Sequence, residues 1–238
     1  MLILQKGLIY SGKRKKQISV SSEYSQETWV DQTFNNDHPS VINPWKRLVD
    51  IVGGLLGLFV TGIIFLPLAI LIKLDSDGPV LYSQTRCGLN GRKFTIWKFR
   101  SMTVDADQKK HLVENMAQGH IFKNPNDPRI TRIGKLLRTT SVDEFPQFWN
   151  VLIGDMSLVG TRPPTPNEVE NYDEYHCLRM KVKPGLTGEW QVRGRSLCLN
   201  FNDIVKMDID YQHKWSVWYD LYLILKTFGI VLKRQGAM

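Results

Sequence analysis

The sequence has 238 residues and a net charge of +8, from 31 lysine and arginine residues against 23 aspartate and glutamate residues. This excess favours an anionic partner, and beside an apolar stretch it indicates phospholipid or phosphorylated substrates and no nucleic acid. Cys87, Cys177 and Cys198 are widely spaced and the five histidines lack zinc-site spacing, which argues against a disulfide framework and a zinc site.

Residues 1–43 predict a flexible N-terminal tail, because they are polar, mixed in charge and without a strong period. A basic cluster at residues 12–16 could touch anionic lipid, although a solvated charge run is the more ordinary interpretation.

Residues 51–72 contain no charge, and as a straight helix they would be about 33 Å long, close to the thickness of a bilayer core. The alternative is a buried core helix, which glycines such as Gly57 would favour. We expect a membrane helix over residues 44–74. Pro67 should bend it near residues 63–66, so it either spans the bilayer or re-enters on the same side.

Residues 75–238 predict one catalytic or binding domain. Residues 80–86 and 93–99 alternate between apolar and polar side chains, and an Asn-Gly pair lies between them, so we expect a β-hairpin. Residues 103–117 predict a helix with acidic residues near its start.

The rest of the domain predicts a mostly helical α+β fold with interfacial amphipathic helices. Aromatic residues of the last helix could lie at a membrane interface or pack in the domain. In chain order we expect a basic helix at 130–137, a helix from Asp143 as N-cap to Leu152, a short strand near 157–160, an extended segment at 161–166, a helix at 167–180, a loop at 183–188, a short strand at 190–192, and helices at 201–212 and 215–232.

Asp143 and Glu144 are candidate functional residues, because two adjacent carboxylates follow a basic helix that contains Arg138. Positive surroundings favour the ionised carboxylate, which suits a nucleophile or a metal ligand. Helix capping is the simpler alternative. Lys98, Arg100 and Arg162 are candidates for binding phosphate, or they are solvated surface residues.

Long motifs then indicate a family. They include WKFRSM at residues 97–102, the run at residues 127–163 that begins DPRITRIGKLLRTTSVDEFPQ, and KPGLTGEWQVRGRS at residues 183–196. The sequence resembles the bacterial sugar transferases, the small monotopic polyprenyl-phosphate phosphoglycosyl transferases, over residues 46–234.

The resemblance implies an enzyme on the cytoplasmic face of the bacterial inner membrane. It would transfer a phosphosugar from a nucleoside-diphosphate sugar, commonly UDP-linked, to polyprenyl (undecaprenyl) phosphate, and so initiate exopolysaccharide, O-antigen or glycan assembly. It implies Asp143 as the nucleophile that forms a covalent aspartyl-phosphosugar, with Glu144 assisting through Mg²⁺. Membrane lipids are further expected partners, as is a second copy of the chain in a homodimer.

Carried over by motif, Lys98 and Arg138 face the phosphates, Arg162 belongs to a Pro-Arg-Pro element, and the segment with Gly185, Thr187 and Gly188 is an active-site loop. Two features depart from the family pattern. Pro67 lies about one helical turn after the usual Ser-Pro break, and Thr161 replaces the proline before Arg162.

The resemblance also predicts the minimal form of the family, without additional transmembrane helices. Two alternatives remain on the residues alone: a membrane phosphohydrolase that uses water as acceptor, and a non-enzymatic factor for polysaccharide assembly.

Overall fold

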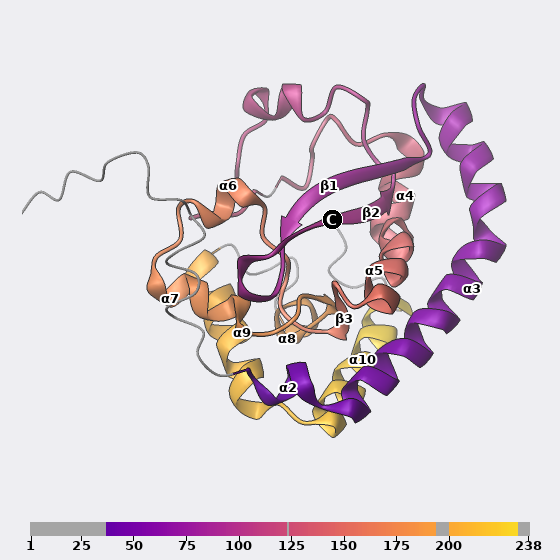
Figure 1. Cartoon of the computed structure of the whole chain (residues 1–238). Helices are drawn as coiled ribbons and strands as arrows, with labels where there is room; N and C mark the ends of the chain where they lie inside the picture. The colour runs from indigo at the N-terminus through magenta and orange to yellow at the C-terminus, as the bar shows by residue number, and fades with distance from the viewer. Residues whose placement is uncertain (1–36, 123, 194–199, 233–238) are drawn as a thin grey trace, which may run out of the picture.

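A computed structural model describes residues 37–122, 124–193 and 200–232, and the predictions for the basic cluster at 12–16 and for Cys198 lie outside these ranges. The fold is a mixed, mostly helical one, as predicted (Figure 1). Its elements are α2 (Pro39–Ile42), α3 (Pro44–Asp75), β1 (Leu81–Cys87), η1 (Leu89–Gly91), β2 (Lys93–Phe99), η2 (Gln108–Leu112), α4 (Arg132–Thr140), η3 (Val142–Gln147), α5 (Phe148–Ile153), β3 (Ser157–Val159), α6 (Pro166–Val169), α7 (Glu174–Cys177), η4 (Leu178–Lys181), β4 (Gly185–Thr187), α8 (Glu189–Arg193), α9 (Phe201–Lys214) and α10 (Val217–Leu232).

The predicted β-hairpin is confirmed. Strands β1 and β2 pair antiparallel, with Leu81 opposite Phe99 and Cys87 opposite Lys93. Asn90 in the connection has a φ of 52°, a left-handed conformation that asparagine tolerates well. Phe94, Ile96 and other apolar residues of β2 enter the core, and the helices α4 and α5 lie between the hairpin and α3 (Figure 1).

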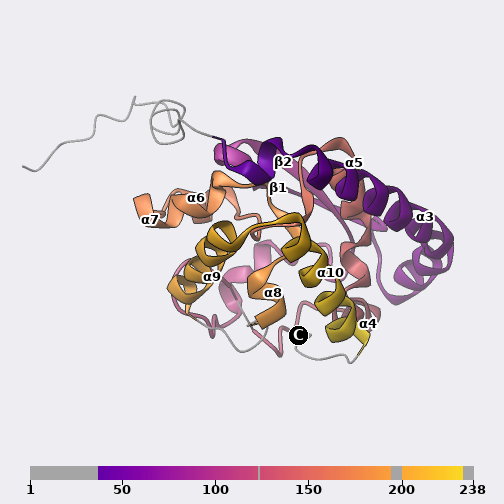
Figure 2. The same cartoon turned by 90° about the horizontal axis from the view of Figure 1, so that it is seen from below.

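The first helices of the sequence extend further than predicted. Part of the expected tail forms the short helix α2, in which Ser40 is buried and His38 accepts a hydrogen bond from the Ser40 amide. The predicted membrane helix is one continuous helix, α3, with Pro67 inside it. It curves around one side of the domain, opposite α6 and α7 (Figures 1 and 2).

Helix α3 packs along the domain through one stripe of residues at helical spacing. The buried members of this stripe are Lys46, Asp50, Gly54, Gly57, Thr61 and Ile72. A Cβ atom on Gly57 would lie 2.3 Å from the Phe148 ring, so a glycine is needed for α5 to approach this closely. The opposite face of α3 is apolar and exposed, with Leu56, Phe59 and Leu66 each more than 60% accessible.

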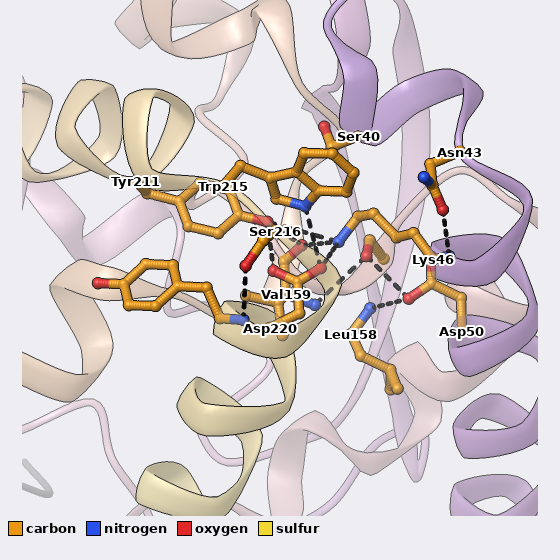
Figure 3. A network of polar contacts seen from close by, with 12 residues as sticks. Ser40, Asn43, Lys46, Asp50, Leu158, Val159, Tyr211, Trp215, Ser216 and Asp220 are labelled. Carbon is orange, nitrogen blue, oxygen red and sulfur yellow. Dashed lines mark hydrogen bonds and ion pairs between the residues drawn. The ribbon is translucent and has the colours of Figure 1, made fainter.

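A buried polar network connects the start of α3 to the start of α10 (Figure 3). The Lys46 ammonium lies 2.5 Å from the Asp220 carboxylate of α10 and donates to the Val159 carbonyl at 3.0 Å. Asp220 also accepts from the Tyr211 hydroxyl at 2.8 Å and from the Trp215 indole at 3.2 Å. Both charges are therefore buried with partners, as a low-dielectric site requires.

The other end of α3 is held by the same domain. The Arg100 guanidinium donates to the carbonyls of Ser76 and Asp77 at 2.7 Å, and the Asp75 carboxylate accepts from the Ile133 amide at 2.9 Å. Both ends of the apolar helix are thus tied to one folded unit.

Two predicted helices are wrong or broken. Residues 103–117 form only the 3-10 turn η2, whose side chains are all exposed, because no apolar face is available to stabilise further turns. The helix predicted at 167–180 is divided into α6, α7 and η4. The Asp173 side chain accepts from the His176 amide at 2.8 Å and so starts a new helix in mid-segment.

The predictions for residues 183–192 are also corrected. The expected loop contains strand β4, which pairs parallel with β3 so that Ser157 faces Gly185. The expected strand at 190–192 is helix α8, where the Val192 amide donates to the Gly188 carbonyl at 3.1 Å and Glu189 pairs with Arg193 one turn on. Local β-propensity is overridden here by helical hydrogen bonds and an i,i+4 ion pair.

Candidate active site

The acidic pair lies on η3, directly after α4. Ser141 adopts a left-handed φ of 57° and ends α4, so the predicted N-cap at Asp143 is wrong. Residues three apart share a face of a 3-10 helix. Val142 and Phe145 accordingly pack into the apolar cluster beside α4, and Asp143 and Glu144 line the adjacent cleft.

Two predicted cations lie beside the acidic pair. The Lys98 ammonium from β2 is 2.7 Å from a Glu144 carboxylate oxygen. Arg138, on the last turn of α4, donates to the Ser101 hydroxyl at 2.9 Å. Burial lowers the pKa of the Arg138 guanidinium, and the negative charge of Asp143 opposes that shift. The carboxylate of Asp143, which is 7% exposed, therefore experiences the Arg138 charge.

Arg162 approaches from the segment before α6. Its guanidinium lies 3.3 Å from Glu168, whose carboxylate also accepts from the Thr165 amide at 2.8 Å to form a capping box. Burial alone would raise the pKa of Glu168, but the Arg162 charge, the hydrogen bond from the Thr165 amide and the Arg86 charge together outweigh it and lower that pKa. Glu168 thus stays ionised and holds Arg162 at the cleft. This contact positions Arg162 although Thr161 stands where the Pro-Arg-Pro element has its first proline.

These residues surround a cleft of about 520 Å³. Such a volume is in the range of sites for cofactors and nucleotide-sized ligands. Its lining includes Lys98, Arg100, Arg138, Asp143, Glu144 and Arg162, so the structure brings six of the predicted site residues to one cleft. Basic and acidic groups in a partly enclosed space can neutralise phosphate charge and still present a carboxylate to it.

The charged residues of the cleft that the sequence analysis missed include Arg86, Arg129 and Asp127. Arg86, from β1, donates to the Pro163 carbonyl at 2.9 Å, and burial followed by the nearby Arg162 charge lowers its pKa to about 10. Arg129 is buried and pairs with Asp127 at 2.6 Å. Each lay inside a long motif run, but residue type and spacing did not separate it from ordinary surface charge.

Arg100 also lines the cleft, but its contacts favour a structural role over the predicted binding of substrate phosphate. Arg100 is 5% exposed, and its guanidinium donates to Ser76, to Asp77 and, at 2.6 Å, to the Pro79 carbonyl. Its donors are used to satisfy the carbonyls at the end of α3. The residue at the edge of the cleft therefore has a structural role.

The predicted active-site loop is placed beside a second pocket. Gly185 and Thr187 belong to β4 and line a pocket of about 220 Å³, which shares Lys98, Glu144 and Arg162 with the cleft. Gly188 lines neither space. A Cβ atom there would lie 2.1 Å from the Gly160 carbonyl, so this glycine serves the close approach of two backbones.

No group of three or more histidine, cysteine, aspartate or glutamate residues among the described ranges could hold a metal ion by itself. Mg²⁺, however, is commonly bound through one or two carboxylates together with substrate phosphates. Asp143 and Glu144 at the cleft provide that kind of donor set, so the residues fit a magnesium ion held jointly with a diphosphate.

Fold and site together define a class of protein: a domain with a cation-lined cleft, an acidic pair whose Asp143 is buried, and a long apolar helix along its side. Residues 41–234 match the family described as bacterial sugar transferase. The chain belongs to this family, and the family predicted from the sequence motifs is confirmed.

Curated relatives match the chain over most of its length. It is 47% identical to a galactosyl transferase, CpsE, of Streptococcus agalactiae over 94% of this chain and 49% of that protein. It is 42% identical to a UDP-glucose:undecaprenyl-phosphate glucose-1-phosphate transferase of Escherichia coli over 76% of this chain and 39% of that protein. An uncharacterized sugar transferase, EpsL, of Bacillus subtilis is 37% identical over 80% of this chain and 89% of its own length. The chain thus spans about half the length of the Streptococcus agalactiae relative and less than half the length of the Escherichia coli relative.

Proposed function

We propose that the protein transfers a sugar 1-phosphate from a nucleoside-diphosphate sugar, a UDP-sugar by preference, to undecaprenyl phosphate and so initiates polysaccharide synthesis. The observation that carries this proposal is the nearly buried Asp143 carboxylate in a cleft lined by Lys98, Arg138 and Arg162. Relatives whose names include undecaprenyl-phosphate sugar phosphotransferases support it.

In the first step an oxygen of the Asp143 carboxylate attacks the β-phosphorus of the nucleotide sugar. The bond from that phosphorus to the bridging oxygen breaks, and nucleoside monophosphate leaves with the electron pair. An aspartyl-phosphosugar remains on the protein. Lys98, Arg138 and Arg162 neutralise charge that develops on the phosphates, which lowers the barrier to the transfer.

In the second step an oxygen of the acceptor phosphate attacks the same phosphorus. The bond between phosphorus and Asp143 breaks, which frees the carboxylate and yields a polyprenyl-diphosphate sugar. Glu144 would hold Mg²⁺ together with the diphosphate. When bound there, the ion supplies positive charge to the phosphate oxygens.

We further propose that α3 enters the cytoplasmic leaflet of the bacterial inner membrane and returns to the same side. Within the described part of the chain it is the one helix long and apolar enough to cross a membrane, yet only 11% of its most apolar window is buried in the domain. Both of its ends contact one domain, through Lys46 and Asp75, and this favours re-entry over a span. Exposed apolar residues of α10 would add to the lipid-facing surface: Trp218, Tyr222, Leu225 and Phe228.

This topology can be tested with single cysteines introduced at Ile42, before α3, and at Asn126, in the domain. We expect both to react with a membrane-impermeant reagent from the same side of inverted vesicles. Labelling from opposite sides would show that α3 spans the bilayer.

The substitution Asp143→Asn tests the chemistry. It should reduce release of nucleoside monophosphate from a panel of nucleotide sugars by about a thousandfold or more, as deletion of a nucleophile does in other enzymes. Asp105→Asn is the matched control, because Asp105 is an exposed carboxylate outside the cleft. Near-normal turnover of Asp143→Asn would remove Asp143 as nucleophile. Steady release without any lipid phosphate would indicate a hydrolase.

A further inference from the structure

The second pocket shares lining residues with the cleft, and its walls include residues of β1, β2, η3, β4, α8 and α10. Strand β4 contributes Thr187, α8 contributes Gln191, η3 contributes Gln147, and α10 contributes Thr227 together with Ile230 and Val231. Its volume is about 220 Å³. Lys98, Glu144 and Arg162 line both spaces, so the two adjoin at charged residues of the candidate active site.

One end of this pocket is polar and has unused hydrogen-bonding capacity. Gln147 is 4% exposed, and its side-chain nitrogen has no hydrogen-bond partner among the described residues. The side-chain oxygen of Gln191 is likewise buried and unpartnered. An unsatisfied buried polar group costs about 1–3 kcal/mol, so a ligand with polar atoms is expected to meet these groups.

The cations at this end define the charge of that ligand. Lys98 and Arg162 both line the pocket, and so does Arg86, whose pKa is lowered by burial and by the charge of Arg162. Glu144, which pairs with Lys98, and Glu168, which pairs with Arg162, offset only part of this charge, so the three cations keep an excess of positive charge beside the pocket. A phosphate group matches both the charge and the amide donor of Gln147.

The other end of the pocket is apolar and belongs to α10. Ile230 and Val231 line it, and the Thr227 hydroxyl is hydrogen-bonded to the Leu223 carbonyl at 2.7 Å and to the Thr187 hydroxyl at 2.6 Å. On the outer side of the same helix, Leu225 and Phe228 are 71% and 63% exposed. An apolar wall is therefore close to an apolar outer surface that we assign to the membrane.

We propose that the second pocket binds the phosphate and first isoprene units of the polyprenyl phosphate acceptor, while the larger cleft binds the nucleotide sugar. This inference rests on the proposed function and adds which space each substrate occupies. Lys98 and Arg162, common to both spaces, would contact the donor phosphates in the first step and the acceptor phosphate in the second. The lipid tail would leave the pocket along α10.

The substitution Ile230→Trp fills the pocket from its apolar side, and Leu112→Trp places the same side chain at an exposed position of η2, in the lining of neither space, as a control. The burst of nucleoside monophosphate with nucleotide sugar alone measures active protein in each preparation. Steady-state assays with undecaprenyl phosphate in detergent micelles then give KM for the acceptor. Overpacking costs at least about 1 kcal/mol, so we expect Ile230→Trp to raise this KM by about fivefold or more and Leu112→Trp to leave it unchanged.

Gln147→Met provides a second measurement, because it removes the amide donor at nearly constant volume. We expect it to raise KM for undecaprenyl phosphate more than KM for the nucleotide sugar. An acceptor KM unchanged in Ile230→Trp, or a rise confined to the nucleotide sugar in either variant, would overturn the assignment of the pocket. Absence of any burst in the unsubstituted protein would instead contradict the proposed function.

Discussion

The buried pair of Lys46 and Asp220 should be the main polar attachment of α3 to the C-terminal helices. Their side chains are 5% and 4% exposed. Lys46→Met removes the ammonium and leaves the Asp220 carboxylate buried with two donors, the Tyr211 hydroxyl and the Trp215 indole. Breaking a buried pair costs about 3–5 kcal/mol, and because two donors remain we expect about 3 kcal/mol for this variant.

Denaturant unfolding in detergent micelles, followed by far-UV circular dichroism, measures this free energy. The control is Lys109→Met, which removes an exposed i,i+4 pair with Asp105 and should leave the unfolding free energy nearly unchanged. The double variant Lys46→Met/Asp220→Leu should be more stable than the sum of the single changes predicts, because no buried charge is left unpaired. Equal effects of Lys46→Met and Lys109→Met, or additive single changes, would refute the reasoning.

Three further changes test other contacts. Gly134→Ala should lower the thermal unfolding midpoint, at a cost of about 1–3 kcal/mol, because its Cβ would lie 2.0 Å from the Ser101 carbonyl; an unchanged midpoint would contradict that contact. Arg100→Met should destabilise the protein without raising KM for the nucleotide sugar, and a raised KM at full stability would restore a phosphate-binding role. Folding lowers the pKa of the Glu168 carboxylate from its ordinary value of 4.5. The carboxylate therefore contributes stability that is fully present above about pH 4.5 and is lost as the pH falls through the lowered pKa. Glu168→Gln should remove this part of the acid dependence of the urea midpoint, and an identical dependence in both proteins would exclude the Arg162 contact as its source.

Local patterns predicted the elements whose signals are strong over many residues. The hairpin was readable because Asn90 and Gly91 separate two alternating runs, and α3 because its apolar run is long. The helix at 103–117 failed because helix-favouring composition is not enough without an apolar face to bury. Strand β4 was missed because three residues have no period, and its existence depends on pairing with β3, which is distant in sequence.

The candidate site was predictable where a motif run marked it, and less so elsewhere. Asp143, Glu144, Lys98, Arg138 and Arg162 come together at the cleft, although 64 positions separate the first and last of these along the chain. The role of a single arginine could not be read from its type, because its partners come from other elements. Arg100 illustrates this, since the end of α3 occupies its donors.

The central claim is that Asp143 carries a sugar phosphate during turnover, and intact-protein mass spectrometry after acid quench tests it most directly. The protein is mixed with its nucleotide sugar in the absence of lipid phosphate. We predict a mass increase equal to one phosphosugar, located by peptide mapping to the segment that contains Asp143, and its loss on addition of undecaprenyl phosphate. An active protein that never acquires this mass, or that carries it on a peptide without Asp143, would contradict the account.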